Sequence, residues 1–174
     1  MWEVASSLSA MPGTGPAGDH TLVSGTGRFL LMTSYGSLAG ALAALTSVAI
    51  VSDGRCSLQF WYCLYGADVG TMYVGINAFS NVSKVVWTAA GSVAGWRFAN
   101  VTLPRVDGAA SVSIVAASTG RVLGNVALDD VSLVGCGGGA RTRVCVCVCV
   151  CVRRGVGRAH VTAARRAPRP RRAR

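Results

Sequence analysis

Acidic residues are missing from the end of this 174-residue chain, and charged residues of either sign are scarce before it. Residues 141–174 hold eleven Arg and no Asp or Glu, whereas residues 1–140 hold six Lys and Arg against seven Asp and Glu. The net charge of +10 therefore belongs to a tail, and the body has a charge near −1, from six minus seven. This distribution excludes a basic nucleic-acid-binding domain but permits a basic appendage.

Zinc-binding spacings and catalytic motifs are also lacking. There is no C-x2-C pair, and His20 and His160 are far apart in the sequence. The body has no nucleophile elbow and no phosphate-binding loop, and the sequence pairs no Ser or Cys nucleophile with Asp19 and His20. We therefore expect no enzymatic activity, no small-molecule substrate, no cofactor, and a structural polar cluster at Asp19 and His20.

Secretory and membrane signals are not visible. Met1 is followed by Trp2, Glu3 and a serine-rich stretch, without the basic and apolar regions of a signal peptide. Residues 29–52 carry no charge and are long enough to cross a bilayer, but Ser, Thr and Gly recur throughout them. Two strands joined by a turn at residues 35–40 are the better interpretation.

Short apolar or alternating runs, separated by Gly, Ser and Asp, recur along the body. These runs are residues 29–32, 42–51, 56–65, 71–79, 84–88, 96–103, 111–117 and 126–134. Helical periodicity with caps is not convincing anywhere, apart from an ambiguous, Ala-rich stretch at 38–45. The pattern predicts an all-β fold, a two-sheet antiparallel β-sandwich.

Several blocks of the body are specific enough to resemble a known family. They are GDHT (18–21), GTGRFLLMTS (25–34), CSLQFWYCLYGADVGTMYV (56–74), VWTAAGSVAGWRFANVTLP (86–104) and NVALDDVSLVGC (125–136). In this order they resemble the MAM domain family, found in the ectodomains of meprins, neuropilins and receptor-type tyrosine phosphatases. The family usually opens with an acidic strand and a cysteine pair that are absent here, so we expect an N-terminally truncated domain that lacks its opening strand.

The resemblance implies a jelly-roll sandwich over residues 1–137 and a function in recognition. The expected role is a non-catalytic extracellular module for cell adhesion or protein–protein interaction, with homophilic binding as one option. The alternative is an accessory domain of a membrane-bound protease or receptor phosphatase whose catalytic part is absent from this chain. Contact with a membrane is expected only through such a parent protein.

Three cysteines lie in the body, and an odd number favours one disulfide and one free thiol in an extracellular domain. The resemblance implies that Cys56 pairs with Cys136; the alternative is two reduced, buried thiols. Strand alternation places Cys56 on the same face as Phe60, where an inter-sheet disulfide would lie. Closing a loop of about 80 residues would contribute on the order of 4 kcal/mol. Cys63 is interpreted as an unpaired thiol without a role.

Large aromatic residues are the expected core anchors: Phe60, Trp61, Trp87 and Trp96. Trp87 and Trp96 bracket a glycine-containing stretch, which predicts two strands joined by a tight reversal.

Two further sets of residues are site candidates. Asp129 and Asp130 precede an apolar strand, and some members of the family bind a cation such as calcium at carboxylates. We favour instead a role for one aspartate in capping a turn through backbone N–H groups. Asn81 and Asn100 begin N-x-S/T sequons and are candidate glycan acceptors in the secretory pathway.

Residues 138–174 form a separate, low-complexity tail that we expect to be disordered. The alternation of Val and Cys from Val144 to Val152 is what a TG dinucleotide repeat encodes, which indicates a translated repeat without selected function. A metal-thiolate strand is the alternative for the four thiols. The Arg-rich end could attract anionic lipid or nucleic acid non-specifically, and no specific nucleic acid is expected.

Overall fold

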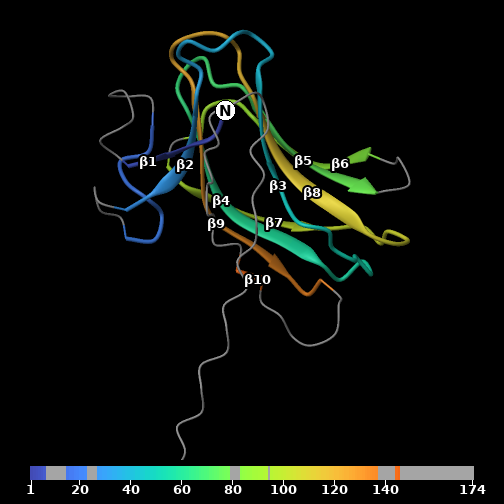
Figure 1. Ribbon diagram of the computed structural model, residues 1–174. Coiled ribbons are helices and arrows are strands. Elements are labelled where there is room, and N and C mark those ends of the chain that lie inside the picture. Colours follow the sequence, from blue (N-terminus) through green and yellow to red (C-terminus); the bar gives the residue numbers. More distant parts are fainter. Residues whose placement is uncertain (7–14, 23–26, 79–82, 94, 137–143, 146–174) are drawn as a thin grey trace, which may run out of the picture.

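Two antiparallel sheets face each other in the computed structural model, which describes residues 1–6, 15–22, 27–78, 83–93, 95–136 and 144–145 (Figure 1). All regular elements in these residues are strands. The predicted two-sheet β-sandwich is therefore confirmed. The predicted disorder of the tail concerns residues that mostly lie outside the described ones.

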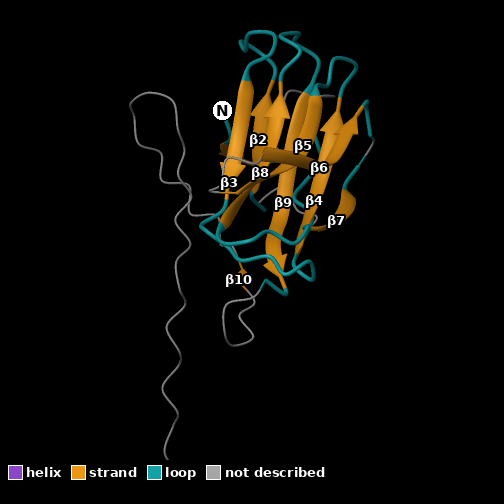
Figure 2. Cartoon of the chain, turned by 90° about the vertical axis from the view of Figure 1, so that its right-hand side faces the viewer, coloured by secondary structure: helices purple, strands orange, loops and turns teal. Residues whose placement is uncertain are grey.

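The first sheet, sheet A, contains the strands that carry most of the site residues. Its order is β1 (Glu3–Ala5), β2 (Phe29–Thr33), β9 (Asn125–Val134), β4 (Ser57–Tyr65) and β7 (Arg97–Thr102), and β10 (Val144–Cys145) also pairs with β9. Sheet B has the order β3 (Leu42–Thr46), β8 (Ala110–Ala117), β5 (Thr71–Ala78) and β6 (Ser83–Ala90). Figure 2 shows the strands of both sheets running along the length of the sandwich.

Consecutive strands often lie in different sheets. The turn at residues 35–40 connects β2 of sheet A to β3 of sheet B, so these strands do not form a hairpin. The stretch between Trp87 and Trp96 likewise leads from β6 in sheet B to β7 in sheet A, so the two expected strands are present and lie in different sheets. The ambiguous stretch 38–45 runs into β3 and contains no helix.

Two short strands were not expected from the sequence. Strand β1 pairs with Phe29–Leu31 of β2 at the edge of sheet A, and β10 pairs with Ser132 and Leu133 of β9. Strands of two or three residues are too short to show an alternating pattern, so tertiary pairing rather than local sequence defines them.

The main core lies between the sheets, and a second apolar cluster covers the outer face of sheet A. Phe60, Leu64 and Met72 are among the fully buried side chains of the main core. The second cluster comprises Ala5, Phe29, Leu31, Cys63 and Ala127. Sheet A is thus buried on both faces over part of its length, so a strand such as β4 alternates between two apolar environments rather than between core and solvent.

Two of the four expected aromatic anchors lie at the main core, and two lie on the outer face of sheet A. Phe60 is in the main core, and Trp87, which is partly buried, packs edge-on against it with ring centroids 5.3 Å apart. Trp96 packs against the second cluster, outside the sandwich interior. The prediction that Trp61 is a core anchor is wrong: it follows Phe60 in β4, so it points to the outer face of sheet A, where it is half-buried.

The uncharged stretch 29–52 provides strands, and no helix among the described residues is long and apolar enough to cross a membrane.

Candidate interaction site

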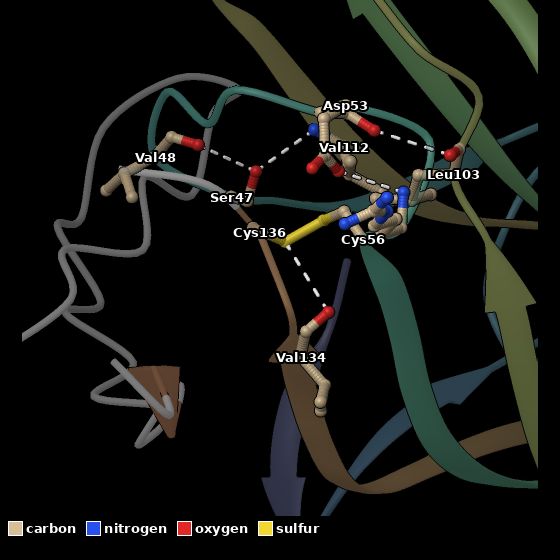
Figure 3. Close-up of a disulfide and its surroundings, with 10 residues drawn as sticks. Ser47, Val48, Asp53, Cys56, Leu103, Val112, Val134 and Cys136 are labelled. Atoms are coloured by element: carbon tan, nitrogen blue, oxygen red, sulfur yellow. Dashed lines mark hydrogen bonds between the residues drawn. A yellow bond between two sulfur atoms is a disulfide. The ribbon is translucent and has the colours of Figure 1, made fainter. Parts of the chain in front are cut away.

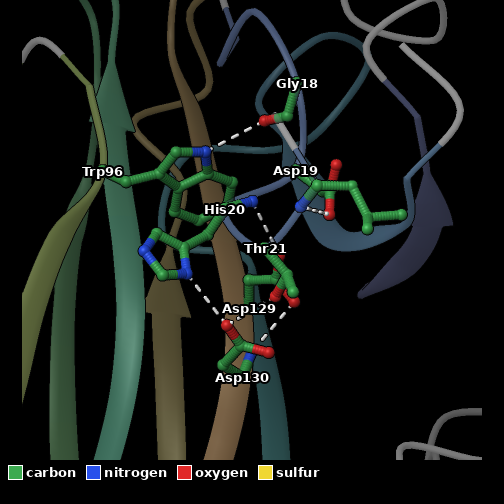
Figure 4. A network of polar contacts seen from close by, with 8 residues as sticks. Gly18, Asp19, His20, Thr21, Trp96, Asp129 and Asp130 are labelled. Carbon is green, nitrogen blue, oxygen red and sulfur yellow. Dashed lines mark hydrogen bonds and ion pairs between the residues drawn. The ribbon is translucent and has the colours of Figure 1, made fainter. Parts of the chain in front are cut away.

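The GDHT segment is attached to the outer face of sheet A by hydrogen bonds to β9 (Figure 4). The backbone N–H of His20 donates to Oδ2 of Asp129 at 2.9 Å. The His20 Nδ1 and the Thr21 hydroxyl both contact Oδ2 of Asp130, at 2.9 Å and 2.8 Å. These contacts bring together residues about 110 positions apart, and they fix the segment over the sheet.

Aromatic rings complete this cluster. The His20 ring stacks on Trp61, with ring centroids 3.6 Å apart and an interplanar angle of 16°. The Trp96 indole donates through Nε1 to the carbonyl of Gly18 at 2.9 Å, so its polar atom is satisfied although the ring is half-buried. Trp61 and Trp96 therefore hold the GDHT segment in place.

A β-bulge in β9 presents the two aspartates. Gln59 of β4 pairs with Ser132 and Trp61 pairs with Asp129, so two steps along β4 oppose three along β9. At the bulge, Asp130 has φ of 48°, in the left-handed region that Asp tolerates better than most residues. The expectation that one aspartate accepts backbone N–H groups agrees with the contacts of Asp129, but the setting is a bulge inside a strand and not a turn.

The carboxylates of Asp129 and Asp19 are both shielded from the solvent. Burial raises the pKa of Asp129 above its usual range, the N–H groups of His20 and Asp130 partly offset this, and the charges of Asp130 and Asp19 raise it further. Asp19 is itself buried, and its Oδ2 accepts from the N–H of Leu22 at 2.9 Å. A Cβ at Gly27 would overlap the Asp19 carboxyl group, so a glycine is needed there.

The cluster lacks the geometry of a catalytic site within the described part of the chain. The Thr21 hydroxyl donates to Asp130 and not to the His20 ring, so the three groups do not form a nucleophile–base–acid series. No group of three or more His, Cys, Asp or Glu side chains is placed to hold a metal in the described ranges. A small cavity of about 110 Å³ adjoins Asp129 and Asp130, below the roughly 300 Å³ of typical small-molecule sites.

A disulfide joins Cys56 and Cys136, with Cα atoms 4.3 Å apart (Figure 3). Cys56 directly precedes β4 and Cys136 follows β9, and these strands are neighbours in sheet A with Ser57 opposite Val134. The expected inter-sheet position is therefore wrong, because β9 is inserted into sheet A beside β4. The backbone N–H of Leu103, just after β7, donates to the carbonyl of Cys56 at 2.8 Å.

Of the two glycosylation candidates, only Asn100 lies among the described residues. Asn81 lies outside the described residues. Asn100 is exposed on β7, at the edge of sheet A, where its Oδ1 accepts from Nε2 of Gln59 at 3.5 Å.

Three connecting loops gather at one end of the sandwich (Figures 1 and 2). The disulfide lies at the other ends of β4 and β9. We call residues 34–41, 66–70 and 118–124 the loop end. Its large exposed apolar side chains are Tyr35, Leu38, Val122 and Leu123, with exposed fractions of 61%, 82%, 51% and 48%. Its charges are Asp68 and Arg121, which form an ion pair at 3.7 Å.

Backbone hydrogen bonds join the three loops of the loop end. The first loop is bonded to the third through Ser34 N to Gly124 O at 3.0 Å and Gly40 N to Ser118 O at 2.8 Å. The second is bonded to the third through Asp68 N to Leu123 O at 2.8 Å. At Gly120, φ is 76° and a Cβ would lie 2.5 Å from the nitrogen of Ala39, so the loops are in close contact. The apolar side chains are therefore displayed on an ordered frame.

Sequence reasoning missed the loop end. Its loops have the Gly and Ser content of ordinary turns, and nothing in the local sequence indicates that turns 80 residues apart share a surface. The available signal was the occurrence of Leu38, Val122 and Leu123 beside turn glycines, where polar residues are more common.

The fold and the contacts define a class of protein: a two-sheet β-sandwich module in which a disulfide joins the ends of two neighbouring strands. The family model for the MAM domain, meprin/A5/mu, matches residues 1–137. The chain belongs to the MAM domain family, and the resemblance predicted from its sequence blocks is confirmed. MAM domains are typically extracellular adhesion or interaction modules without catalytic activity.

Neuropilins are among the similar curated proteins. Neuropilin-1a of Danio rerio is 27% identical over 76% of this chain, and Neuropilin-1 of Xenopus laevis is 32% identical over 68% of it. Neuropilin-1 of Homo sapiens is 29% identical over 69% of this chain. The chain spans only 13–15% of the length of these three relatives.

Two solved structures are also similar to this chain, at low sequence identity. The structure of TmCBM61 in complex with beta-1,4-galactotriose has a TM-score of 0.47 and 13% identity, covering 76% of this chain and 86% of that one. The K3 cleaved adhesin domain of Lys-gingipain from Porphyromonas gingivalis has a TM-score of 0.47 and 17% identity, covering 76% of this chain and 90% of its own.

Proposed function

We propose that this chain is a non-catalytic extracellular module for cell adhesion or protein–protein interaction, and that the loop end makes the contact. The observation that carries the proposal is the set of four exposed apolar side chains held on three mutually bonded loops. Apolar anchors on an ordered frame lose little conformational entropy on binding, which favours affinity.

The charge of the loop end favours a protein partner. Asp68 and Arg121 neutralise each other, so the surface has no net charge that would attract nucleic acid or anionic lipid. An apolar surface with one acid and one base can also be complementary to itself, which makes a second copy of the chain one candidate partner. The other candidate partner is a different protein whose surface has a matching apolar depression.

The disulfide supports an extracellular location. Disulfides persist in oxidising compartments and are rare in the cytosol, and the bond between Cys56 and Cys136 closes a large part of the domain. The neuropilin relatives favour an ectodomain in the same way. Because the chain spans a small share of those relatives, a second proposal is that it is the accessory domain of a larger membrane-bound protein, such as a protease or receptor phosphatase.

The test is adhesion of beads coated with the secreted chain, either to each other or to cultured cells. The double variant Leu38→Ser with Leu123→Ser removes two exposed anchors of the loop end, and we expect it to reduce adhesion by about tenfold or more. The matched control is Val48→Ser with Val51→Ser, which removes two exposed apolar side chains outside the loop end.

The two adhesion assays distinguish the partners. Aggregation of the beads among themselves identifies a second copy of the chain, whereas adhesion to cells alone, lost when the cells are treated with protease, identifies a different protein. The proposal fails if neither assay detects adhesion, or if the loop-end and control variants behave alike.

A further inference from the structure

The sequon at Asn100 lies on a strand with an open edge. Side chains alternate along β7, so Ala99 and Val101 are buried whereas Phe98, Asn100 and Thr102 are exposed on the outer face of sheet A. Strand β7 is the last in the order of sheet A, and nothing in the described part of the chain pairs with its far side. The acceptor amide and the hydroxyl that the sequon requires therefore face the solvent together.

The contact with Gln59 orients the acceptor amide. Gln59 is the register partner of Asn100 on β4, and its Nε2 donates to Asn100 Oδ1 at 3.5 Å. The oxygen of the amide is thus turned toward the sheet. Nδ2, the atom that would carry a glycan, is the other terminal atom of this exposed side chain.

An aromatic surface lies beside this atom. Phe98 is 52% exposed and is the register partner of Trp61, with ring centroids 5.4 Å apart. Trp61 is in turn stacked on the ring of His20, which restricts the movement of Trp61. Two residues along a strand span about 7 Å, which places the Phe98 ring within reach of the first sugar on Asn100.

We propose that Asn100 carries an N-linked glycan whose first N-acetylglucosamine packs its apolar face on Phe98, beside Trp61. The Nδ2 forms a bond to C1 of that sugar and loses a proton, and the lipid diphosphate of the oligosaccharide donor leaves. This inference rests on the proposed passage of the chain through the secretory pathway. The glycan covers the free edge of β7, which otherwise presents unpaired backbone groups to other chains.

The test combines occupancy with an energetic coupling. The whole chain is expressed in mammalian cells behind a secretory leader, and peptide mass mapping of lysate and medium measures sugar at Asn100. Thr102→Val removes the sequon and leaves Asn100 unchanged. We expect it to lower the melting temperature by about 2–4 °C when Phe98 is present, and by less than about 1 °C in Phe98→Leu, where the stacking partner is lost.

The same variants made in bacteria, without glycosylation, are the control. Thr102 and Phe98 lie four residues apart on the strand, roughly 13 Å, so their effects should add when no sugar bridges them. Val85→Ser, at a side chain 53% exposed on β6, controls for the loss of an exposed apolar residue and should leave the effect of Thr102→Val unchanged. Phe98→Trp should restore the coupling.

Two results would overturn the proposal. One is protein without sugar at Asn100; if that protein still adheres through the loop end, the proposed function stands and only the glycan is rejected. The other is full occupancy with the same effect of Thr102→Val whether Phe98 is present or replaced in Phe98→Leu, which would mean that the glycan does not pack on the ring.

Discussion

Residue by residue, burial on both faces of sheet A has its clearest chemical effect at Cys63. Its thiol is fully buried in the second cluster, and burial raises its pKa from 9.0 to about 11, partly offset by a hydrogen bond from the backbone of Gly95. At pH 8 the thiolate population is therefore about 100-fold lower than in the unfolded chain. We expect native Cys63 to react with iodoacetamide at least that much more slowly than in urea, as measured by peptide mass mapping.

The raised pKa of Cys63 also predicts a pH dependence of stability. The stabilising contribution of the neutral thiol is complete below about pH 9, the unfolded value, and is lost as the pH rises through about 11. The free energy of unfolding of Cys63→Ala should therefore fall less between these two pH values than that of the wild type. Two results would contradict a buried thiol. One is that native Cys63 reacts as fast as it does in urea; the other is that the free energy of unfolding of Cys63→Ala depends on pH in the same way as that of the wild type.

At the scale of elements, the bulge of β9 depends on one residue with an unusual backbone. Asp130 combines φ of 48° with hydrogen bonds from His20 and Thr21. Asp130→Asn retains both the tolerance of positive φ and a side-chain oxygen, so it should cost little. Asp130→Gly tolerates the positive φ but loses the side-chain hydrogen bonds, so the free energy of unfolding should fall by about 1 kcal/mol. Asp130→Val loses the hydrogen bonds and also tolerates the positive φ poorly, so the fall should be about 2–3 kcal/mol.

Urea denaturation of the three Asp130 variants measures this order directly. The Gly variant is the control that separates the backbone from the side chain. A Val variant as stable as the Asn variant would show that the bulge relaxes without cost, and that Asp130 does not determine its conformation.

Single strands were predictable where alternation was strong, but the faces of some strands were not. Strand β5 alternates through Met72, Val74 and Ile76, all of them buried, and the sequence predicted it. In β4 the alternation that places Phe60 inward also places Trp61 outward, and the expectation of a core position for Trp61, which rests on the size of its ring, is wrong. Aromatic size predicts burial in general, but the pleat decides the face.

The cluster around His20 was only partly predictable. The sequence indicated a structural role for Asp19 and His20, but it gave no reason to bring them to Asp129 and Asp130, about 110 residues away. That contact requires β9 to lie beside β2 and β4, which is a property of the sheet order. Local pattern carries no information about such an order.

The molecule as a whole is held by pairings between residues distant in sequence. Strand β9, near the end of the domain, lies between β2 and β4, so forming sheet A requires the chain to close loops of about 60 to 100 residues. The disulfide joins the ends of β4 and β9 with a separation of 80 residues, and the chain between them includes β5, β6, β7 and β8. It therefore limits the unfolded chain at one of the two long-range strand pairings of sheet A.

Removing this crosslink should destabilise the entire domain and not one edge of it. For Cys56→Ala with Cys136→Ala we expect the free energy of unfolding, measured by urea denaturation, to fall by about 4 kcal/mol. Cys63→Ala is the matched control, because it removes a buried sulfur that forms no crosslink. If the double variant loses no more than this control, the strand pairing of β4 with β9 must be stable on its own, and chain entropy would not explain why the bond lies there.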